Sequence, residues 1–243
     1  MPVYNRVTLK NFFKNGSSPT QAHFWDLIDS SINKIDDGFA KGINDGLQLS
    51  PLGKSKKLMS FYENVRDEKA DWQVLINPKE SVKGLSVANE EGKSSLFFDK
   101  SGKIGVNTVK PQTRLDVRGT TASKARIGTY AINQVPADAQ WHSIVDGLTG
   151  CHCFEIVAKA EGAPKKGRYA MAHAIAVSCY GAPSSKVKIT QSFYGHFRHR
   201  IKFRWRGSAE NYRLEMKTLR HYNDDSMIRY HVCNLWDDQV FKR

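Results

Sequence analysis

The strongest constraint on the fold is a series of short strand-like segments, each closed by a turn, in the middle of the chain. The segments are residues 72–77, 84–89 and 95–99, and the turns after them contain Pro78, Gly92 and Gly102. Strands of this length bury little apolar area, and a stable sheet needs several of them to share one hydrophobic face. We therefore expect these strands to stack against the same strands of other chains, as in fibrous β-proteins.

An amphipathic helix is predicted before this series, from about Pro19 to Lys41. Ser18 suits the N-cap, Pro19 suits the first helical position, and Gln21 completes a capping box. Apolar residues recur at alternating spacings of three and four, as in a coiled-coil seam, and they are Trp25, Ile28, Ile32, Ile35 and Phe39. Two heptads leave two interpretations open: the seam packs inside its own domain, or it packs against the same helix of other chains.

Shorter sequence patterns predict the secondary structure of the rest of the N-terminal half. The alternation over residues 3–9 is typical of a strand, and Gly16 belongs to the turn that follows. Residues 47–69 are mixed in character and rich in charge. They predict a linker followed by a short helix over residues 57–66.

Residues 120–243 have the pattern of an all-β domain. Apolar and polar residues alternate in five segments, which are 154–158, 187–193, 200–206, 212–217 and 228–232. Strands at this spacing, with glycine-rich and proline-rich turns between them, predict an antiparallel sandwich or jelly roll. Ile201, Phe203 and Trp205 form an apolar face on one of these strands, and its other face is basic, which would block unwanted sheet pairing.

The formal net charge of +13 is concentrated in the C-terminal half, where residues 120–243 carry 19 Lys and Arg against 10 Asp and Glu. This excess indicates an acidic partner, such as a surface polysaccharide, a nucleic acid or a negative protein surface. A charged, soluble surface without a specific partner accounts for it equally well. No apolar stretch approaches the ~20 residues that span a bilayer, so no membrane span is predicted.

All four cysteines, Cys151, Cys153, Cys179 and Cys233, lie in the same half of the chain. The first residues contain no apolar segment of a secretory signal, which favours a reducing compartment. We therefore expect reduced thiols, buried as small apolar side chains. Cys151 and Cys153 are two positions apart on a strand-like segment and are expected to share one face.

Residues 102–119 read G-K-I-G-V-N-T-V-K-P-Q-T-R-L-D-V-R-G. They resemble the element G-x-I-G-I-G-T-x-x-P-x-x-x-L-x-V-x-G, which recurs in phage tail fibres and related trimeric adhesins. The matching positions are Gly102, Ile104, Gly105, Val106, Thr108, Pro111, Leu115, Val117 and Gly119. Asn107 replaces the usual glycine, and asparagine also tolerates the positive φ of such a turn. In the family, three copies of this strand pair wrap round a common axis, so that apolar residues of three chains meet.

A second resemblance lies at the N-terminus. Residues 6–13, Gly16, Pro19-Thr20, Phe24 and residues 27–30 are similar to the opening of fibre-like proteins from phages and contractile injection systems. Both elements occur in the order expected of a particle protein. The resemblance implies a mainly β chain with three parts: an N-terminal α-helical attachment region (1–46), a linker and short β-rich trimeric shaft (47–119), and an antiparallel, jelly-roll-like β-sandwich head (120–243).

The function implied by this resemblance is structural and not enzymatic. The chain would be a homotrimeric part of a phage-tail-like contractile particle, either a short fibre or a protein around the baseplate. Its N-terminal region would bind baseplate or other particle proteins. Trimer contacts are expected at the seam positions given above and at Ile104, Val106, Leu115 and Val117. The chain would be assembled in the cytoplasm and then form part of an extracellular particle or virion.

The alternative function is an adhesin whose head binds an acidic cell-surface glycan. The residues expected to contact such a ligand are Tyr194, His196, Arg198, Arg204 and Trp205. A solvated basic strand face accounts for the same residues, so both interpretations stay open.

Two further groups of residues are candidates for metal binding and for catalysis. The cysteines and His152 lack the C-x₂-C spacing of common zinc sites, so no metal site is predicted. A hydrolase would need His173 or His231 beside Asp224 or Asp237, but the sequence contains neither a nucleophile elbow nor a paired-carboxylate motif. We predict no catalytic residue and no cofactor.

Overall fold

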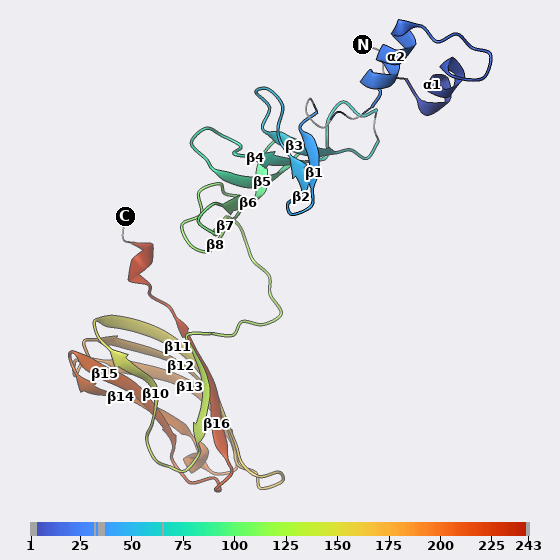
Figure 1. Ribbon diagram of the computed structural model, residues 1–243. Helices are drawn as coiled ribbons and strands as arrows, with labels where there is room; N and C mark the ends of the chain where they lie inside the picture. The colour runs from blue at the N-terminus through green and yellow to red at the C-terminus, as the bar shows by residue number, and fades with distance from the viewer. Residues whose placement is uncertain (1–3, 32, 34–36, 65, 242–243) are drawn as a thin grey trace. The chain divides into compact units, whose positions relative to one another are not determined.

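The computed structural model describes residues 4–31, 33, 37–64 and 66–241 and divides into two compact units (Figure 1). The first unit ends at Thr121 and the second begins at Ala122. Strands far outnumber helices among these residues, and both α-helices that are described lie near the N-terminus. The prediction of a mainly β chain with an N-terminal helical region is therefore confirmed.

Two short helices, α1 (Arg6–Phe12) and α2 (Gln21–Asp29), open the first unit. The ring of Phe12 stacks on His23 with centroids 4.2 Å apart, and Phe13 meets Phe24 edge-on at 5.1 Å. The strand predicted over residues 3–9 is wrong. Asn5 caps α1 instead, since its side-chain oxygen accepts hydrogen bonds from the backbone N–H groups of two residues in the first turn, at 3.0 Å each.

The long helix predicted from Pro19 to Lys41 is also wrong. Helix α2 has Thr20 as its N-cap and ends at Asp29, and Phe39 lies in a two-stranded hairpin of β1 (Phe39–Gly42) and β2 (Gly46–Leu49). Gly38 has a φ of 63°, which a right-handed helix does not allow, so no helix can run through this position to Phe39. Ile32 and Ile35, the middle of the predicted seam, lie outside the described residues.

The rest of the first unit is one six-stranded sheet whose strands follow one another in chain order. Neighbouring strands are antiparallel except for the last pair, which is parallel. The strands are β3 (Lys57–Phe61), β4 (Trp72–Ile76), β5 (Gly84–Asn89), β6 (Ser94–Asp99), β7 (Ile104–Val106) and β8 (Leu115–Val117). The predicted strands are confirmed, whereas the helix over residues 57–66 is wrong because its first half pairs with β4.

The connection from β7 to β8 explains the glycine-rich motif. Asn107 has a φ of 57°, which confirms the predicted turn, and its N–H donates to the Ser95 carbonyl at 3.0 Å. Gly105 is buried, and a Cβ atom built on it would overlap the carbonyl oxygen of Thr108. The motif therefore needs glycine here for close backbone approach, and not for an unusual φ.

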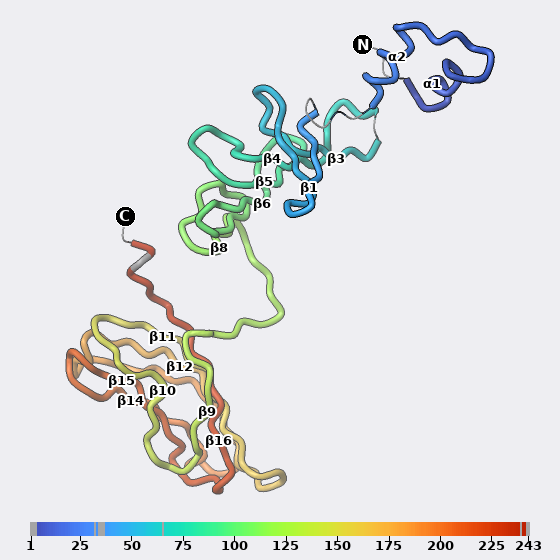
Figure 2. Tube along the Cα trace, in the orientation of Figure 1, coloured from blue at the N-terminus to red at the C-terminus, as the bar shows by residue number. Residues whose placement is uncertain are grey.

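The second unit contains two antiparallel sheets (Figure 2), the larger with the order β13-β12-β11-β16-β9 and the smaller with the order β10-β15-β14. Strand β9 lies beside β16 at one edge of the larger sheet. The strands are β9 (Ala131–Pro136), β10 (His142–Leu148), β11 (Cys151–Glu161), β12 (Tyr169–Cys179), β13 (Lys186–Tyr194), β14 (Ile201–Ser208), β15 (Asn211–Thr218) and β16 (Met227–Asn234). Two 3₁₀ turns, η1 (Phe197–His199) and η2 (Asp238–Val240), complete the unit.

One hydrophobic core joins the two sheets of the second unit. Phe154 and Ile156 of β11 are buried with Leu214 and Met216 of β15. Alternate residues of each strand point into this core, as expected for sheets packed face to face. All five predicted segments lie within or largely within strands of these sheets, so the all-β character of this half is confirmed.

Replacing Gly105 by alanine should destabilise the first unit by about 2 kcal/mol or more, because the added methyl group meets backbone that has no room to shift. Gly119→Ala is the matched control, since a Cβ there meets nothing within 4 Å. Urea unfolding followed by tryptophan fluorescence measures both. Equal stability of the two variants would contradict the packing role of Gly105.

Candidate interaction surfaces

The six-stranded sheet has one face made almost wholly of large apolar side chains, here called the apolar face. Directly paired residues lie on the same side of a sheet, and residues alternate along each strand, so the register defines its members. Asn89, opposite Trp72, is its polar member, and the apolar members are Met59, Phe61, Trp72, Val74, Ile76, Leu85, Val87, Leu96, Phe98, Ile104, Val106, Leu115 and Val117. Five of them are exposed, namely Met59, Phe61, Trp72, Phe98 and Leu115.

The opposite face of the same sheet carries small and polar residues together with Leu75 and Phe97, and the buried side chains of the sheet lie on this face. Gln73, Ser86 and Ala88 are each less than 10% exposed, and Phe97 is fully buried. The Ser86 hydroxyl donates to that of Ser94 at 2.8 Å. Burial is therefore inverted relative to a stable isolated sheet, in which the large apolar face is the one covered.

Within the described part of the chain, no second sheet or helix packs extensively on the apolar face. Its exposed members lie on β3, β4, β6 and β8, and exposed apolar patches mark interaction sites. Ile104, Val106, Leu115 and Val117, the predicted trimer contacts of the shaft, all belong to it. Leu115 is 60% exposed although it is a large apolar residue on a paired strand.

The structure places the predicted contacts of the N-terminal seam on different elements. Trp25 and Ile28 lie on α2 and are 59% and 62% exposed, so their side chains are free to meet another surface. Phe39 is on β1, opposite Leu49, and does not continue a helical seam. The two exposed residues of α2 are thus the described remainder of the seam.

The outward face of the small sheet in the second unit carries a cluster of cations around one aromatic ring. We call this cluster the basic platform, and its members are Trp141, Lys202, Arg204, Arg206, Arg213, Glu215 and Lys217. Lys202 lies opposite Lys217, and Arg206 lies opposite Arg213. The Arg204 guanidinium stands 4.1 Å from the centre of the Trp141 ring, and the Lys217 ammonium stands 4.9 Å from it.

Glu215 is the buried member of the platform and binds two of its arginines. Its carboxylate accepts a hydrogen bond from Nε of Arg204 at 2.6 Å and another from Nε of Arg213 at 2.7 Å. Burial alone would raise the pKa of Glu215, but the hydrogen bonds and charges of the two arginines outweigh it and lower that pKa. An ionised Glu215 therefore holds both guanidinium groups in place, with Trp141 beside that of Arg204.

The predicted ligand-contact residues occupy three separate places. Tyr194 is exposed at the end of β13, where His196 caps η1 and Arg198 lies over the Phe197 ring. Arg204 belongs to the basic platform. Trp205 points the other way, because it packs on the core next to Phe154 and Tyr212.

The structure therefore does not bring these five residues together. It adds Trp141, which the sequence did not single out because it lies just before β10, outside any basic or alternating segment.

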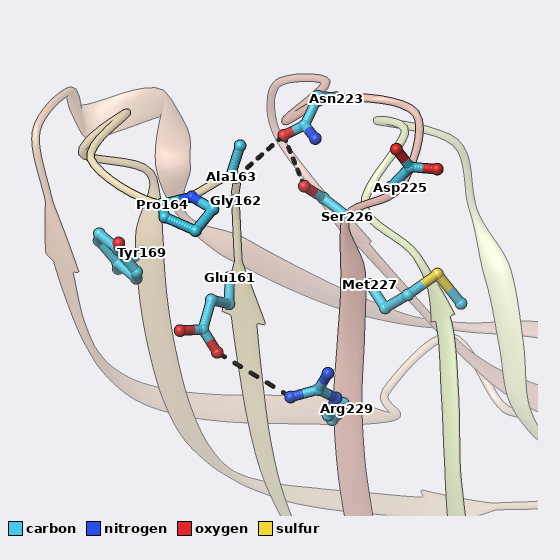
Figure 3. Close-up of a pocket in the computed structure, with 10 residues that line it drawn as sticks. All are labelled: Glu161, Gly162, Ala163, Pro164, Tyr169, Asn223, Asp225, Ser226, Met227 and Arg229. Carbon is cyan, nitrogen blue, oxygen red and sulfur yellow. Dashed lines mark hydrogen bonds and ion pairs between the residues drawn. The ribbon is translucent and has the colours of Figure 1, made fainter.

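A cavity of about 460 Å³ lies between the β11–β12 connection and the segment before β16 (Figure 3). The Glu161 carboxylate points toward Arg229, 4.0 Å away, and Lys159 contacts it at 2.8 Å. The hydrogen bond from Lys159 lowers the pKa of Glu161. A general acid needs a raised pKa, so Glu161 is not suited to that role.

The residues weighed for catalysis and metal binding are dispersed. His173 contacts Glu155 at 2.9 Å, the ring of His231 accepts a hydrogen bond from the Gly128 N–H, and Asp224 lies 3.4 Å from His221. His152 donates toward the Thr149 carbonyl and stacks near Phe154, away from the cysteine side chains. Among the described residues, no group of three or more His, Cys, Asp or Glu side chains has the geometry of a metal site.

The electrostatics of Glu215 give a pH-dependent prediction. Because the pKa of Glu215 is lower in the folded protein than in the unfolded chain, the ionised carboxylate contributes its full stabilisation above the ordinary pKa of 4.5. This stabilisation is lost as the pH falls through the folded-state pKa. Glu215→Gln should reduce stability at pH 7 by roughly 1–3 kcal/mol and flatten the loss of stability between about pH 5 and 3. Urea unfolding across this range measures it, with Glu210→Gln in the exposed β14–β15 turn as control. Parallel pH profiles for all three proteins would refute the role of Glu215.

None of the helices in the described residues has the length and apolar character needed to cross a bilayer. Comparison with protein-family models gives no match to this chain, and comparison with curated proteins gives none either. Evidence on function therefore comes from the sequence elements and from the surfaces described above.

Proposed function

We propose that the chain is a non-enzymatic structural component of a phage-tail-like contractile particle and that it works as a homotrimer. It serves as a short fibre or as a protein that surrounds the baseplate. The N-terminal region attaches to other particle proteins, residues 47–119 form a trimeric shaft, and residues 120–243 form a jelly-roll-like head. The particle is assembled in the cytoplasm and acts outside the cell.

The inverted burial of the six-stranded sheet is the observation that carries the homotrimer. Five large apolar side chains are exposed on one face, whereas the buried side chains of the sheet lie on the other, so the apolar face needs a cover to be stable in water. Copies of the same chain meet this need through symmetry, since each copy offers the same apolar surface to its neighbours. The resemblance of residues 102–119 to trimeric fibre elements supports three copies.

The particle role is supported by the N-terminal region. Trp25 and Ile28 are exposed on α2, in the segment that resembles the opening of fibre-like proteins. Exposed aromatic and aliphatic residues on a short helix suit attachment to a partner protein. A structural role also fits the dispersed histidines and carboxylates, which are engaged in ion pairs and hydrogen bonds of the fold.

Placing a charge on the apolar face should break the trimer. Leu115→Glu is chosen because Leu115 is largely exposed within one chain, so the variant should fold while the symmetric contact fails. We expect the wild type to have three times the 27.5 kDa mass of one chain. The variant trimer should dissociate into single chains at protein concentrations at least about 100-fold higher than those at which the wild-type trimer dissociates.

Sedimentation velocity measures both proteins, and circular dichroism confirms folding. Ser60→Glu is the control, because Ser60 is exposed on the other face of the sheet and should leave the trimer intact. A monomeric wild type at micromolar concentration would refute the homotrimer.

The basic platform favours a second candidate function, a head that binds an acidic cell-surface glycan. Five cations share this face, two of them bind one buried carboxylate, and the Trp141 ring lies against Arg204 and Lys217. Guanidinium groups held by Glu215 are oriented before any ligand arrives, which lowers the entropy lost on binding sulfate or carboxylate groups.

Reversing two charges of the platform should weaken glycan binding. Lys202→Glu with Arg206→Glu is expected to lower affinity for heparin, a sulfated polysaccharide, roughly tenfold or more at moderate salt. The matched control reverses Lys186 and Lys188, two exposed lysines of β13. Surface plasmon resonance on immobilised heparin measures all three proteins. An equal loss in both double variants would show a general charge effect and would count against the platform.

A further inference from the structure

Two cysteines of the second unit face each other across a pair of strands. In the antiparallel register of β11 and β12, Cys151 lies directly opposite Cys179. The N–H of Tyr180 donates to the Gly150 carbonyl at 2.6 Å, and this bond flanks the pair, so the cysteines occupy a non-hydrogen-bonded position. Cα atoms at such positions are about 4.5 Å apart, which lies within the range that a disulfide bridges.

The two thiols are also accessible. Cys151 and Cys179 are exposed and free, which corrects the expectation that all the cysteines are buried as apolar residues. The neighbouring Cys179 side chain, more than burial or nearby charge, raises the pKa of Cys151. Cys179 is therefore the group that acts most strongly on the Cys151 thiol.

The other cysteines do not form such a pair. Cys153 lies on the same face of β11, as predicted, but its partner on β12 is Val177. Cys233 on β16 lies opposite Glu155. Both are half-buried, so they differ from Cys151 and Cys179 in partner and in access.

We propose that Cys151 and Cys179 are a redox modification site that forms an intrachain disulfide when the protein meets an oxidising environment. The oxidant is a small-molecule disulfide such as oxidised glutathione. One cysteine thiolate attacks a sulfur atom of this molecule, which creates a mixed disulfide and releases one small thiol. The second cysteine attacks the protein-bound sulfur and releases the other small thiol. Two protein thiols thus lose two protons and two electrons, and one small disulfide is reduced to two thiols.

The disulfide would tie the start of β11 to the end of β12. These strands carry much of the core, including Phe154 and Ile156 on one and Ala174 and Ala176 on the other. A bridge between residues 151 and 179 restricts the unfolded chain and so stabilises the folded head. The biological setting rests on the proposed function, because a particle protein moves from a reducing cytoplasm to an oxidising exterior.

The test oxidises the reduced full-length chain with glutathione disulfide and maps thiols by peptide mass spectrometry. We expect free thiols to fall from four to two, with one linked peptide pair that contains Cys151 and Cys179. The thermal midpoint of the second unit should rise by roughly 5 °C or more and return after reduction with dithiothreitol.

Two variants make the test specific. Cys153→Ser with Cys233→Ser should keep both the linked peptide and the thermal shift. Cys151→Ser should lose both and retain at most a glutathione adduct on Cys179. Stable glutathione adducts on both cysteines of the wild type, or links between chains, would overturn the proposal. Because the readout is an intrachain link, its failure leaves the homotrimer untouched, and a monomeric chain leaves the disulfide untouched.

Discussion

The uncovered apolar face of the six-stranded sheet is the constraint on which the first unit depends. Strands of three to six residues supply a modest core on one side, where Phe97 is fully buried beside Ser86 and Ala88. The larger apolar side chains, including Trp72 and Leu115, lie on the other side and remain in contact with water. Since hydrophobic burial is the dominant favourable term in folding, such a sheet is most stable when a second surface covers it.

The second unit meets the same requirement within one chain. Its two sheets place alternate residues of eight strands in a common core, so each sheet covers the other. The outward faces are then available for other purposes. The small sheet uses its outward face for the basic platform, which Glu215 holds together, and the large sheet exposes Cys151 and Cys179 at one end. The second unit therefore covers its own apolar faces, whereas the first unit leaves one of them exposed.

Local sequence patterns predicted most strands correctly. They failed where pairing with another strand determines the secondary structure. The strand at residues 84–89 was found to the residue because its alternation and its turns are both local signals. Residues 57–61 contain lysine and serine and resemble a helix, yet they pair with β4. Strand β12 was missed as a strand because alanines alternate with Met171, Ile175 and other apolar residues, which removes the contrast between its two faces.

The sequence by itself determined the β character, the turn at Asn107 and the alternation that gathers Ile104, Val106, Leu115 and Val117 on one face, because these follow from local sterics and a period of two. Only the tertiary structure decided which face of the six-stranded sheet is buried, that Trp141 lies beside Arg204, and that Cys151 lies opposite Cys179. Those outcomes depend on which strands pair and in which register, and a shift of one residue between β11 and β12 would separate the two cysteines.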